Sequence, residues 1–337
     1  MSSLNIDHAI VGRLQADYYI TRNDTPVIEQ LGGSAVYSAV GAGIWSRAVG
    51  LVSRIGTNFR RDWIGALAEH GLDTDGVRSA ESEQEHRRFF AYRPNEDAVV
   101  HSDPASQFAR IGRRLPAQLR DYDEHRALDS PSQFGPLAAR PDELPPAYQR
   151  ARAMHVAPCD FVTHRTMPAA ARALGIRTIT CDPDERYMQA SYQAEVRLIV
   201  SGLDAFLPSE AKTTNFFRTE VDDMWEAAEG FAAMGAAIVV IKRGAHGQYV
   251  FDAGARTRWH VPAYPTRVAD VTGAGDAYGG GFLIGLADTG DAVEAALRGS
   301  ISASLVIESR DPFYALNAHP HLAEARLGAH RELVRKI

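Results

Sequence analysis

The segment DVTGAGDAYGGGF, residues 270–282, places the small residues Gly273, Ala274 and Gly275 directly before an acid, Asp276, and an apolar run of helical character. The first turn of a helix leaves four backbone N–H groups without intrahelical partners, and the helix dipole adds about half a positive charge there. Small residues let a ligand approach these donors, so the segment predicts an anion site, usually for phosphate. An acid repels an anion, and its usual reason to lie beside phosphate is proton abstraction.

The elements that must position this segment alternate between strands and helices. Strand-like apolar runs and helix-like runs follow one another along both halves of the chain. We predict strands at 6–11, 51–56, 153–158, 177–183 and 237–244, a strand with its loop over 200–210, a hairpin over 248–264, and helices at 35–49, 62–71, 165–175, 224–236, after Asp276 and at 292–309. This order predicts a three-layer α/β/α fold with a mostly parallel central sheet. Ligands bind such sheets beyond the carboxyl ends of the strands, and DVTGAGD falls at such an end.

Two β-prone segments, 14–31 and 86–102, do not fit this alternation and are expected to form a small sheet outside the main body. The turn between the two strands of the second segment is predicted at PNED, residues 94–97. Residues 103–142 are rich in proline and charge and have no sustained periodicity, so we interpret them as an insertion with a short helix near 113–121.

The composition excludes several classes of protein. The 337-residue chain has 42 acidic and 36 basic residues, which disfavours a nucleic-acid partner. No apolar run approaches the roughly 18 residues of a membrane span, so no membrane association is expected. The two cysteines, Cys159 and Cys181, do not form a disulfide framework in a chain of this length and favour a cytoplasmic location. Only three lysines occur, Lys212, Lys242 and Lys336, and none follows a glycine run as in a Walker A loop.

Four segments follow one another along the chain: the paired glycines of QLGGSAVYSAVGAG, CDPDER (181–186), the turn in VVIKRGAHG (239–247) and DVTGAGD. In this order they resemble the ribokinase-like, or PfkB, family of carbohydrate and nucleoside kinases. The resemblance covers most of the chain outside the insertion. It implies one ribokinase-like kinase domain over 1–337, in which the small sheet is a lid that excludes water from the reaction.

The resemblance also implies site residues on the nucleotide side. Asp276 would be the general base, and the N–H groups of Gly273, Ala274, Gly275 and Asp276 would form an anion hole for the transferred phosphoryl group. The cofactors would be ATP and Mg²⁺. Residues expected to lie against the nucleotide are Lys242, Gly244, Gly247, Thr272 and Lys212. Asp270 would help to hold a monovalent cation such as K⁺, as in some members of the family.

On the acceptor side, Asp17 resembles an acid that binds sugar hydroxyls, and a carboxylate can accept two hydrogen bonds from a diol. A turn or capping acid is the alternative for this residue. Gly32 and Gly33 would let the backbone approach the sugar. Ser38 stands where many sugar kinases have an asparagine that contacts substrate.

The sequence departs from the family where magnesium and phosphate are expected. The family pattern N-x-x-E becomes SEAK, with Ser209 at the Asn position and Lys212 at the Glu position. Lys212 either contacts phosphate or is a solvated helix residue. Glu210 would serve Mg²⁺ through water, and Asp184 replaces the Asn of D-x-N-x-R.

The function expected from these residues is phosphoryl transfer from ATP to a hydroxyl of a sugar or sugar-like polyol. A nucleoside kinase and a non-catalytic ligand-binding or regulatory protein are the alternatives. The lid predicts either a homodimer that pairs through its exposed edge or, if the insertion covers that edge, a monomer.

Overall fold

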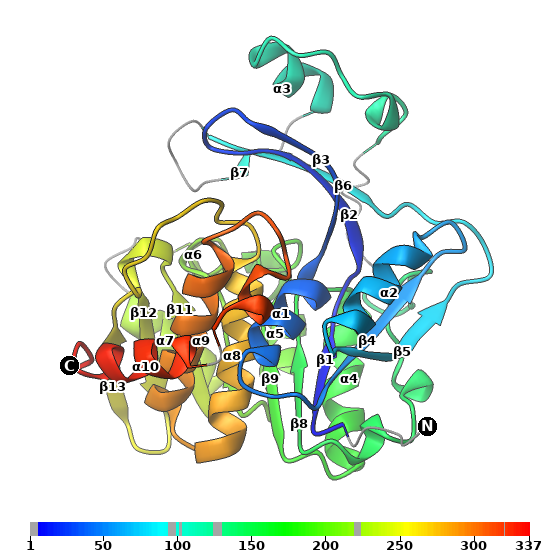
Figure 1. Ribbon diagram of the computed structural model, residues 1–337. Helices are drawn as coiled ribbons and strands as arrows, with labels where there is room; N and C mark the ends of the chain where they lie inside the picture. The colour runs from blue at the N-terminus through cyan, green and yellow to red at the C-terminus, as the bar shows by residue number, and fades with distance from the viewer. Residues whose placement is uncertain (1–5, 94–98, 101–102, 124–129, 219–223, 320) are drawn as a thin grey trace.

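A computed structural model describes residues 6–93, 99–100, 103–123, 130–218, 224–319 and 321–337. In this part of the chain a twisted ten-stranded sheet runs through the centre of the molecule, in the order β14-β13-β12-β11-β10-β9-β8-β1-β4-β5 (Figure 1). The strands from β11 to β5 are parallel, and β12, β13 and β14 continue the sheet antiparallel. The bounds are β1 His8–Val11, β4 Val49–Ile55, β5 Asp73–Ser79, β8 Ala153–Val156, β9 Thr178–Cys181, β10 Ala205–Phe206, β11 Ile238–Lys242, β12 Gln248–Asp252, β13 Thr257–Val261 and β14 Arg335–Lys336.

Helices cover both faces of this sheet because its strands are apolar on both sides. Along β1, Ile10 belongs to the core on one face, and Ala9 and Val11 belong to the core on the other. The first face carries α1 Ser34–Gly43, α2 Arg61–Glu69, α8 Ala274–Thr289, α9 Ala292–Val306 and α10 Leu322–Arg331. The second carries α4 Phe161–Ala173, α5 Gln193–Val200, α6 Glu210–Phe217 and α7 Met224–Ala233. The predicted three-layer α/β/α fold is confirmed.

Helix α8 packs against α1, α9 and β8, and its three consecutive glycines explain how it fits there. A Cβ at Gly279 would lie 2.5 Å from His155 Nε2 on β8. A Cβ at Gly280 would overlap the Ser38 carbonyl of α1, and one at Gly281 would overlap the Ser302 hydroxyl of α9. Each glycine therefore admits a different neighbour, and the run GGG serves packing rather than ligand binding.

The lid is a separate four-stranded sheet, in the order β3-β2-β6-β7. Its strands are β2 Gln15–Ile20, β3 Pro26–Gly32, β6 Arg87–Tyr92 and β7 Val99–Val100, so the β-prone segments 14–31 and 86–102 form it as expected. Strands β2 and β6 pair in parallel, and the outer pairs are antiparallel. Figure 1 shows the lid standing above the carboxyl ends of the central strands. The predicted PNED turn and residues 101–102 lie outside the described residues.

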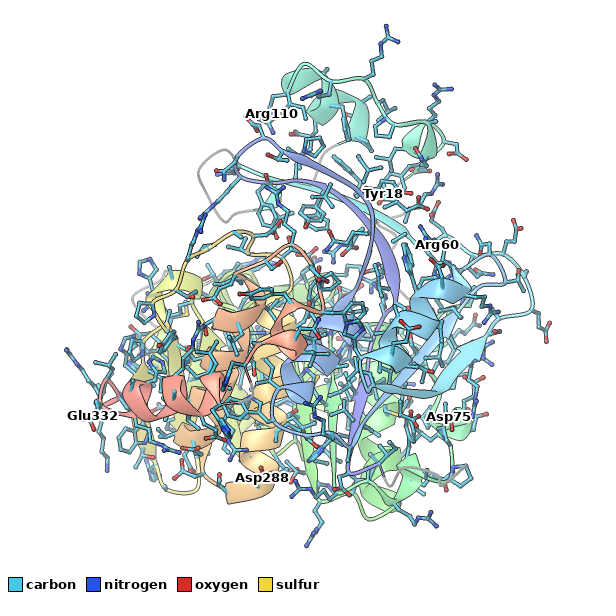
Figure 2. The ribbon with its side chains drawn as sticks, viewed as in Figure 1. Tyr18, Arg60, Asp75, Arg110, Asp288 and Glu332 are labelled. Atoms are coloured by element: carbon cyan, nitrogen blue, oxygen red, sulfur yellow. The ribbon has the colours of Figure 1, made fainter. Side chains whose placement is uncertain are left out.

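The insertion packs on the outer face of the lid. Phe108 of α3 (Pro104–Arg110) and Leu119 of a 3₁₀ turn (η1, Ala117–Leu119) form a core with Ala16, Tyr18 and Phe89 of the lid. Figure 2 shows Arg110 on α3 above the lid and Tyr18 on the strand beneath it. Of the short helix predicted near 113–121, the structure has only the 3₁₀ turn η1. The α-helix of the insertion lies earlier, at 104–110, where the Asp103 side chain accepts a hydrogen bond from the Ser106 N–H and Pro104 begins the first turn. Residues 124–129 of the insertion lie outside the described residues.

Five further 3₁₀ turns complete the described elements. They are η2 Pro141–Glu143, η3 Tyr148–Arg150, η4 Ala190–Tyr192, η6 Gly244–His246 and η7 Tyr314–Asn317. No helix in the described ranges is both long enough and apolar enough to cross a membrane.

Candidate active site

The amino end of α8 lies at the carboxyl edge of the central sheet, directly beneath the lid. Gly273 caps the helix with a φ of 78°, a left-handed conformation that favours glycine, and a Cβ there would overlap the Tyr37 ring. Gly275 and Asp276 lie in the first turn, where backbone N–H groups have no intrahelical partner. The Ala274 N–H instead donates to the Val271 carbonyl at 3.2 Å. The expectation that Ala274 serves the anion hole is therefore wrong in this geometry.

Asp276 is partly buried and has an unusually basic carboxylate. Burial, and to a smaller extent the negative charge of Asp182, raise its pKa to about 6 against the opposing charges of Lys242, Lys212 and Arg88. A carboxylate with such a pKa is ionised at neutral pH and is a stronger base than an exposed aspartate. The position of Asp276 and its pKa both suit proton abstraction beside an anion.

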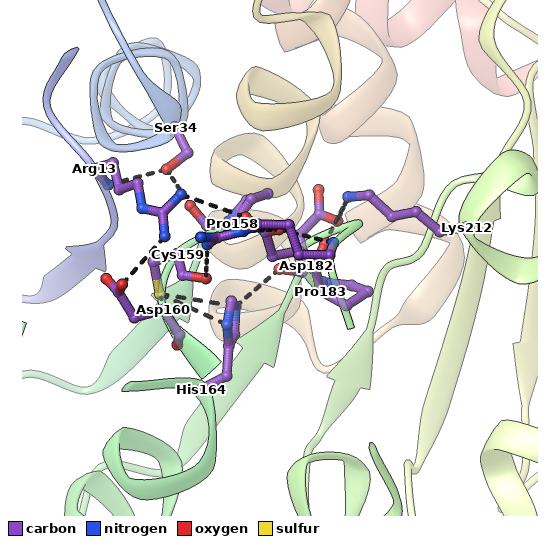
Figure 3. A network of polar contacts seen from close by, with 11 residues as sticks. Arg13, Ser34, Pro158, Cys159, Asp160, His164, Asp182, Pro183 and Lys212 are labelled. Carbon is purple, nitrogen blue, oxygen red and sulfur yellow. Dashed lines mark hydrogen bonds and ion pairs between the residues drawn. The ribbon is translucent and has the colours of Figure 1, made fainter. Parts of the chain in front are cut away.

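Three charged side chains meet at the carboxyl ends of β9 and β11. Asp182 follows β9 and is 2% exposed; its Oδ1 accepts from Lys212 Nζ at 2.9 Å, and its Oδ2 accepts from Lys242 Nζ. Lys212 comes from the first turn of α6, which Ser209 caps, and Lys242 is the last residue of β11. We call these three residues the lysine clamp. Figure 3 shows Lys212 extended toward Asp182.

The buried side chain of His164 supports the loop that carries Asp182. His164 of α4 contacts the Asp182 carbonyl through Nε2 at 3.1 Å, and burial lowers the pKa of this imidazole to about 4 (Figure 3). His164 is therefore neutral at physiological pH and acts here as a hydrogen-bonding support. The Asp182 carboxylate is thus fixed by both its backbone and its two lysines.

The glycine turn after β11 brings Gly244 and Gly247 to the same edge of the sheet. Their φ angles are 55° and 81°, and a Cβ at Gly247 would overlap the Val261 carbonyl. The turn thus requires glycine for its backbone shape. Its position after Lys242 is consistent with the expectation that the turn lies against a nucleotide.

On the lid, Asp17 faces the same site as Asp276. It is 3% exposed, packs against Gly32, where a Cβ would overlap its carboxylate, and accepts a hydrogen bond from the Gly33 N–H. Its Oδ1 has no partner among the described residues. Burial, with a smaller contribution from the charge of Asp276, raises the pKa of Asp17 to about 6 against the opposing effects of Arg88 and the Gly33 N–H. The two carboxylates are therefore close enough for their charges to interact. One hydroxyl-bearing substrate can thus contact both Asp17 and Asp276.

Arg88 is a site residue that no sequence pattern distinguishes from its neighbour Arg87. It is the register partner of Asp17 on β6, and its charge opposes the raised pKa of both Asp17 and Asp276. Strand alternation places Arg88 on the lid face opposite to Phe89, which packs against the insertion. The lid therefore offers an acidic and a basic side chain next to each other above α8.

Two tyrosines fasten the lid to the DVTGAGD loop. Tyr19 Oη donates to Asp270 Oδ2 at 3.0 Å, and Tyr92 Oη lies 3.0 Å from Thr272 Oγ1. Asp270 Oδ1 also accepts from the Thr272 N–H at 3.0 Å, and Arg310 Nε is 3.9 Å from Oδ2. The Asp270 carboxylate is thus engaged by a guanidinium, a phenol and an amide, which does not fit a ligand of a monovalent cation. In this structure Thr272 contacts the lid.

Glu210 does not fit the expected role toward Mg²⁺. Its carboxylate accepts from Arg243 Nε at 2.8 Å, and Asp182 is already shared by two lysines. Within the described residues no group of three or more His, Cys, Asp or Glu side chains is arranged to hold a metal ion. The carboxylates of Asp182 and Glu210 are therefore committed to basic side chains.

Ser38 is fully buried in α1, where its carbonyl lies against Gly280 of α8. Its hydroxyl has no hydrogen-bond partner among the described residues. Its expected role as a substrate ligand stays a prediction. Asp184 pairs with Arg186 at 2.8 Å and with Arg13 at 3.7 Å, and Arg13 also reaches Asp160 at 3.2 Å (Figure 3). No spacing in the sequence indicates this ion-pair network, because it joins loops after β1, β8 and β9.

A doubly wound sheet with a small lid above the amino end of α8 defines a sugar-kinase type of fold. The match of residues 149–317 to the sequence profile of the pfkB family carbohydrate kinases identifies the family, and the chain belongs to it. A cytidine kinase from Thermococcus kodakarensis is 27% identical over 283 residues, which are 83% of this chain and 88% of that one.

Solved structures share the fold at lower identity. Ribokinase of Arabidopsis thaliana, complexed with ribose and ATP, superposes with a TM-score of 0.68 at 15% identity and covers 95% of this chain and 98% of that one. A putative ribokinase II of E. coli, in complex with ATP and Mg²⁺, gives 0.66 at 16% identity and covers 96% and 100%. The ribokinase-like fold of this chain is thereby established.

Proposed function

We propose that this chain is an ATP-dependent kinase that transfers the γ-phosphoryl group to a hydroxyl of a sugar or sugar-like polyol. The observation that carries the proposal is the pairing of Asp276, a partly buried acid of raised pKa at the amino end of α8, with Asp17 of the lid above it. A protein that only binds a sugar has no need of a strong base beside an anion site. Family membership supports the same chemistry.

The proposed mechanism assigns a separate task to each side of the site. Asp17, with Oδ1 unpartnered among the described residues, accepts hydrogen bonds from acceptor hydroxyls, and the backbone at Gly32 and Gly33 lies close to them. Asp276 takes the proton of the attacking hydroxyl, the oxygen forms a bond to the γ-phosphorus, and the bond to the β-phosphate oxygen breaks with its electrons leaving on ADP. The N–H groups of Gly275 and Asp276 stabilise the transferred group. The glycine turn after β11 lies against the nucleotide.

A nucleoside is the second candidate acceptor. The 27% identity to a cytidine kinase over 83% of this chain favours it. A nucleoside carries the same kind of ribose hydroxyls that Asp17 would bind, so the lid chemistry suits both classes. Discrimination between them requires a measurement.

That measurement is ADP formation by the purified chain with ATP and one acceptor at a time. The panel holds neutral sugars, inositols and nucleosides, and each is compared with a reaction that lacks acceptor. We expect acceptor-dependent ADP with at least one sugar or polyol. Turnover confined to nucleosides would replace the sugar by a nucleoside, and ATP binding without turnover on any acceptor would favour a regulatory protein.

The raised pKa values predict a specific pH profile. Asp276 must be ionised to act as a base, and Asp17 binds hydroxyl donors better when ionised, so kcat/KM is expected to fall as pH drops through about 6, where burial places the pKa of both groups. Because two groups must lose a proton, the slope of log(kcat/KM) against pH should approach two on the acid side. In Asp17→Asn only Asp276 titrates there, and this slope should fall to one. A profile that stays flat to pH 5 would contradict both assignments.

The tyrosine contacts predict how the lid affects acceptor binding. Tyr19→Phe removes a hydrogen bond to the buried carboxylate of Asp270, and such bonds contribute about 1.5–3 kcal/mol. We expect the acceptor KM to rise about tenfold while kcat changes little, because the lid closes less often but the chemistry is intact. Tyr18→Phe is the matched control, because Tyr18 packs on the opposite lid face against the insertion. Equal effects of the two variants would argue against a lid contact at Tyr19.

A further inference from the structure

The lysine clamp has more hydrogen-bonding capacity than its protein partners use. An ammonium group has three N–H donors. Lys212 Nζ donates to Asp182 Oδ1 at 2.9 Å and to the Pro183 carbonyl at 2.6 Å; Lys242 Nζ donates to Asp182 Oδ2 and lies 3.4 Å from the Gly275 carbonyl. Among the described residues each lysine thus keeps capacity for at least one further acceptor.

The clamp also carries a net positive charge in a mostly buried position. Two ammonium groups share one carboxylate, and the Lys212 and Lys242 side chains are only 17% and 12% exposed. Burial lowers the pKa of both lysines. For Lys212 the charges of Asp182, Asp184 and Asp276 outweigh burial and raise the pKa, whereas the pKa of Lys242 stays lowered, by burial and by the charge of Lys212. An anionic ligand would stabilise the charged form of Lys242 and accept the N–H donors that the two lysines do not use within the protein. The clamp is therefore suited to an anionic ligand.

The position of the clamp identifies that ligand as a polyphosphate. Lys242 Nζ is next to the Gly275 carbonyl, in the first turn of α8, and the charges of both lysines reach Asp276. A ligand whose terminal phosphoryl group lies at the amino end of α8 would place its next phosphate groups within reach of the clamp. Asp182 accepts hydrogen bonds from both lysines and so holds the two ammonium groups close to each other.

We propose that the lysine clamp binds the β- and γ-phosphates of the nucleotide directly, so that the chain binds ATP tightly without a divalent metal ion. The proposal rests on the proposed function only in taking ATP as the ligand. The proposal also explains why Asp182 and Glu210 pair with basic side chains. In this chain the lysines supply the positive charge beside the phosphates, and a metal ion held by carboxylates is not needed for it. Lys212 and Lys242 are thus binding residues for the triphosphate.

The test is the Kd of the full chain for ATP by titration calorimetry, in EDTA and in excess MgCl₂. Wild type is expected to bind metal-free ATP within about tenfold of its affinity for MgATP. Lys212→Met should weaken metal-free ATP about 10- to 100-fold, the loss expected for a hydrogen bond between charged groups, and weaken MgATP less because Mg²⁺ already neutralises part of the phosphate charge. Lys212→Arg should retain metal-free binding.

Lys336 supplies a matched control, because it is the only lysine outside the clamp in the whole sequence. It lies on β14, with Nζ 5.5 Å from the Trp259 ring centre. Lys336→Met should leave both Kd values unchanged. Reductive methylation of wild type gives a second readout that needs no variant: metal-free ATP or inorganic tripolyphosphate should protect Lys212 and Lys242 but not Lys336.

The outcomes separate the two proposals. ATP binding that needs Mg²⁺, with no protection of Lys212 or Lys242 in EDTA, would overturn the lysine clamp as a phosphate site while leaving the kinase intact. No ATP binding under either condition would overturn the proposed function and the clamp together. Metal-free binding that Lys212→Met weakens and Lys336→Met does not would support the clamp.

Discussion

Asp276→Asn is expected to lower kcat by about 10²- to 10⁴-fold, the range that general acid–base catalysis contributes. The substitution keeps the size and the hydrogen-bonding shape of the side chain but removes its ability to accept the hydroxyl proton. Because the proposed ATP site consists of backbone groups and lysines and does not include this carboxylate, the Kd for ATP should not rise. The measurement is steady-state ADP formation with the best acceptor from the panel, together with the Kd for ATP.

The same variant should be more stable than the wild type. Burial raises the pKa of Asp276 from 3.8 to about 6, so ionising it in the folded state costs about 2–3 kcal/mol above pH 6 relative to the unfolded chain. The cost shrinks as pH falls through 6 toward 4, where both states become protonated. Asp276→Asn removes it, so the free energy of unfolding should rise at pH 7.5 and rise less at pH 5. An unchanged kcat, or a loss of stability at pH 7.5, would contradict the role given to this carboxylate.

Gly280→Ala is expected to destabilise the fold by about 2–4 kcal/mol, although alanine favours helices. The added Cβ would overlap the Ser38 carbonyl of α1, a backbone atom that cannot rotate away. Helices α1 and α8 would have to separate, which disturbs both the Gly33 cap and the amino end of α8. Urea unfolding followed by circular dichroism measures the change, with equal m-values required for the comparison.

Gly328→Ala provides the control for this substitution. Gly328 lies within α10 and is exposed, and a Cβ added there would have no neighbouring group within 4 Å. The substitution should therefore stabilise the chain by up to about 1 kcal/mol, the helix-propensity difference between the two residues. Destabilisation of similar size at both positions would mean that the contact between α1 and α8 is not the cause.

The residues that could be predicted from the sequence are those whose chemistry depends on neighbours in the chain. Asp276 and Gly273 sit in one helix start, and the paired glycines Gly32 and Gly33 precede another, so local patterns indicate their geometry. The lid strands were likewise predictable, because the aromatic residues of β2 and β6 favour strands. The structure adds the reason why aromatic residues lie on both faces of these strands: one lid face packs on the insertion and the other faces the site.

The site residues that could not be predicted are far apart in the sequence and come together only because their strands are neighbours in the sheet. Asp182, Lys212 and Lys242 follow or end β9, β10 and β11, which are adjacent strands, and no spacing along the chain shows that their side chains share one point. The segment 200–210, predicted as a strand with its loop, contains a strand of only two residues, β10, between the end of α5 and the start of α6. Apolar periodicity cannot resolve such short elements, because a buried strand and a buried helix end have the same composition.

The most direct test of phosphoryl transfer follows the γ-phosphate itself. The chain is incubated with ATP labelled at the γ-phosphorus and the acceptor that gives most ADP, and the label is located by chromatography. If Asp276 and the lid act as proposed, the label appears on the acceptor, with little in inorganic phosphate, and Asp276→Asn abolishes the transfer. Label released only as inorganic phosphate, or equal transfer by wild type and Asp276→Asn, would contradict a kinase that uses Asp276 as its base.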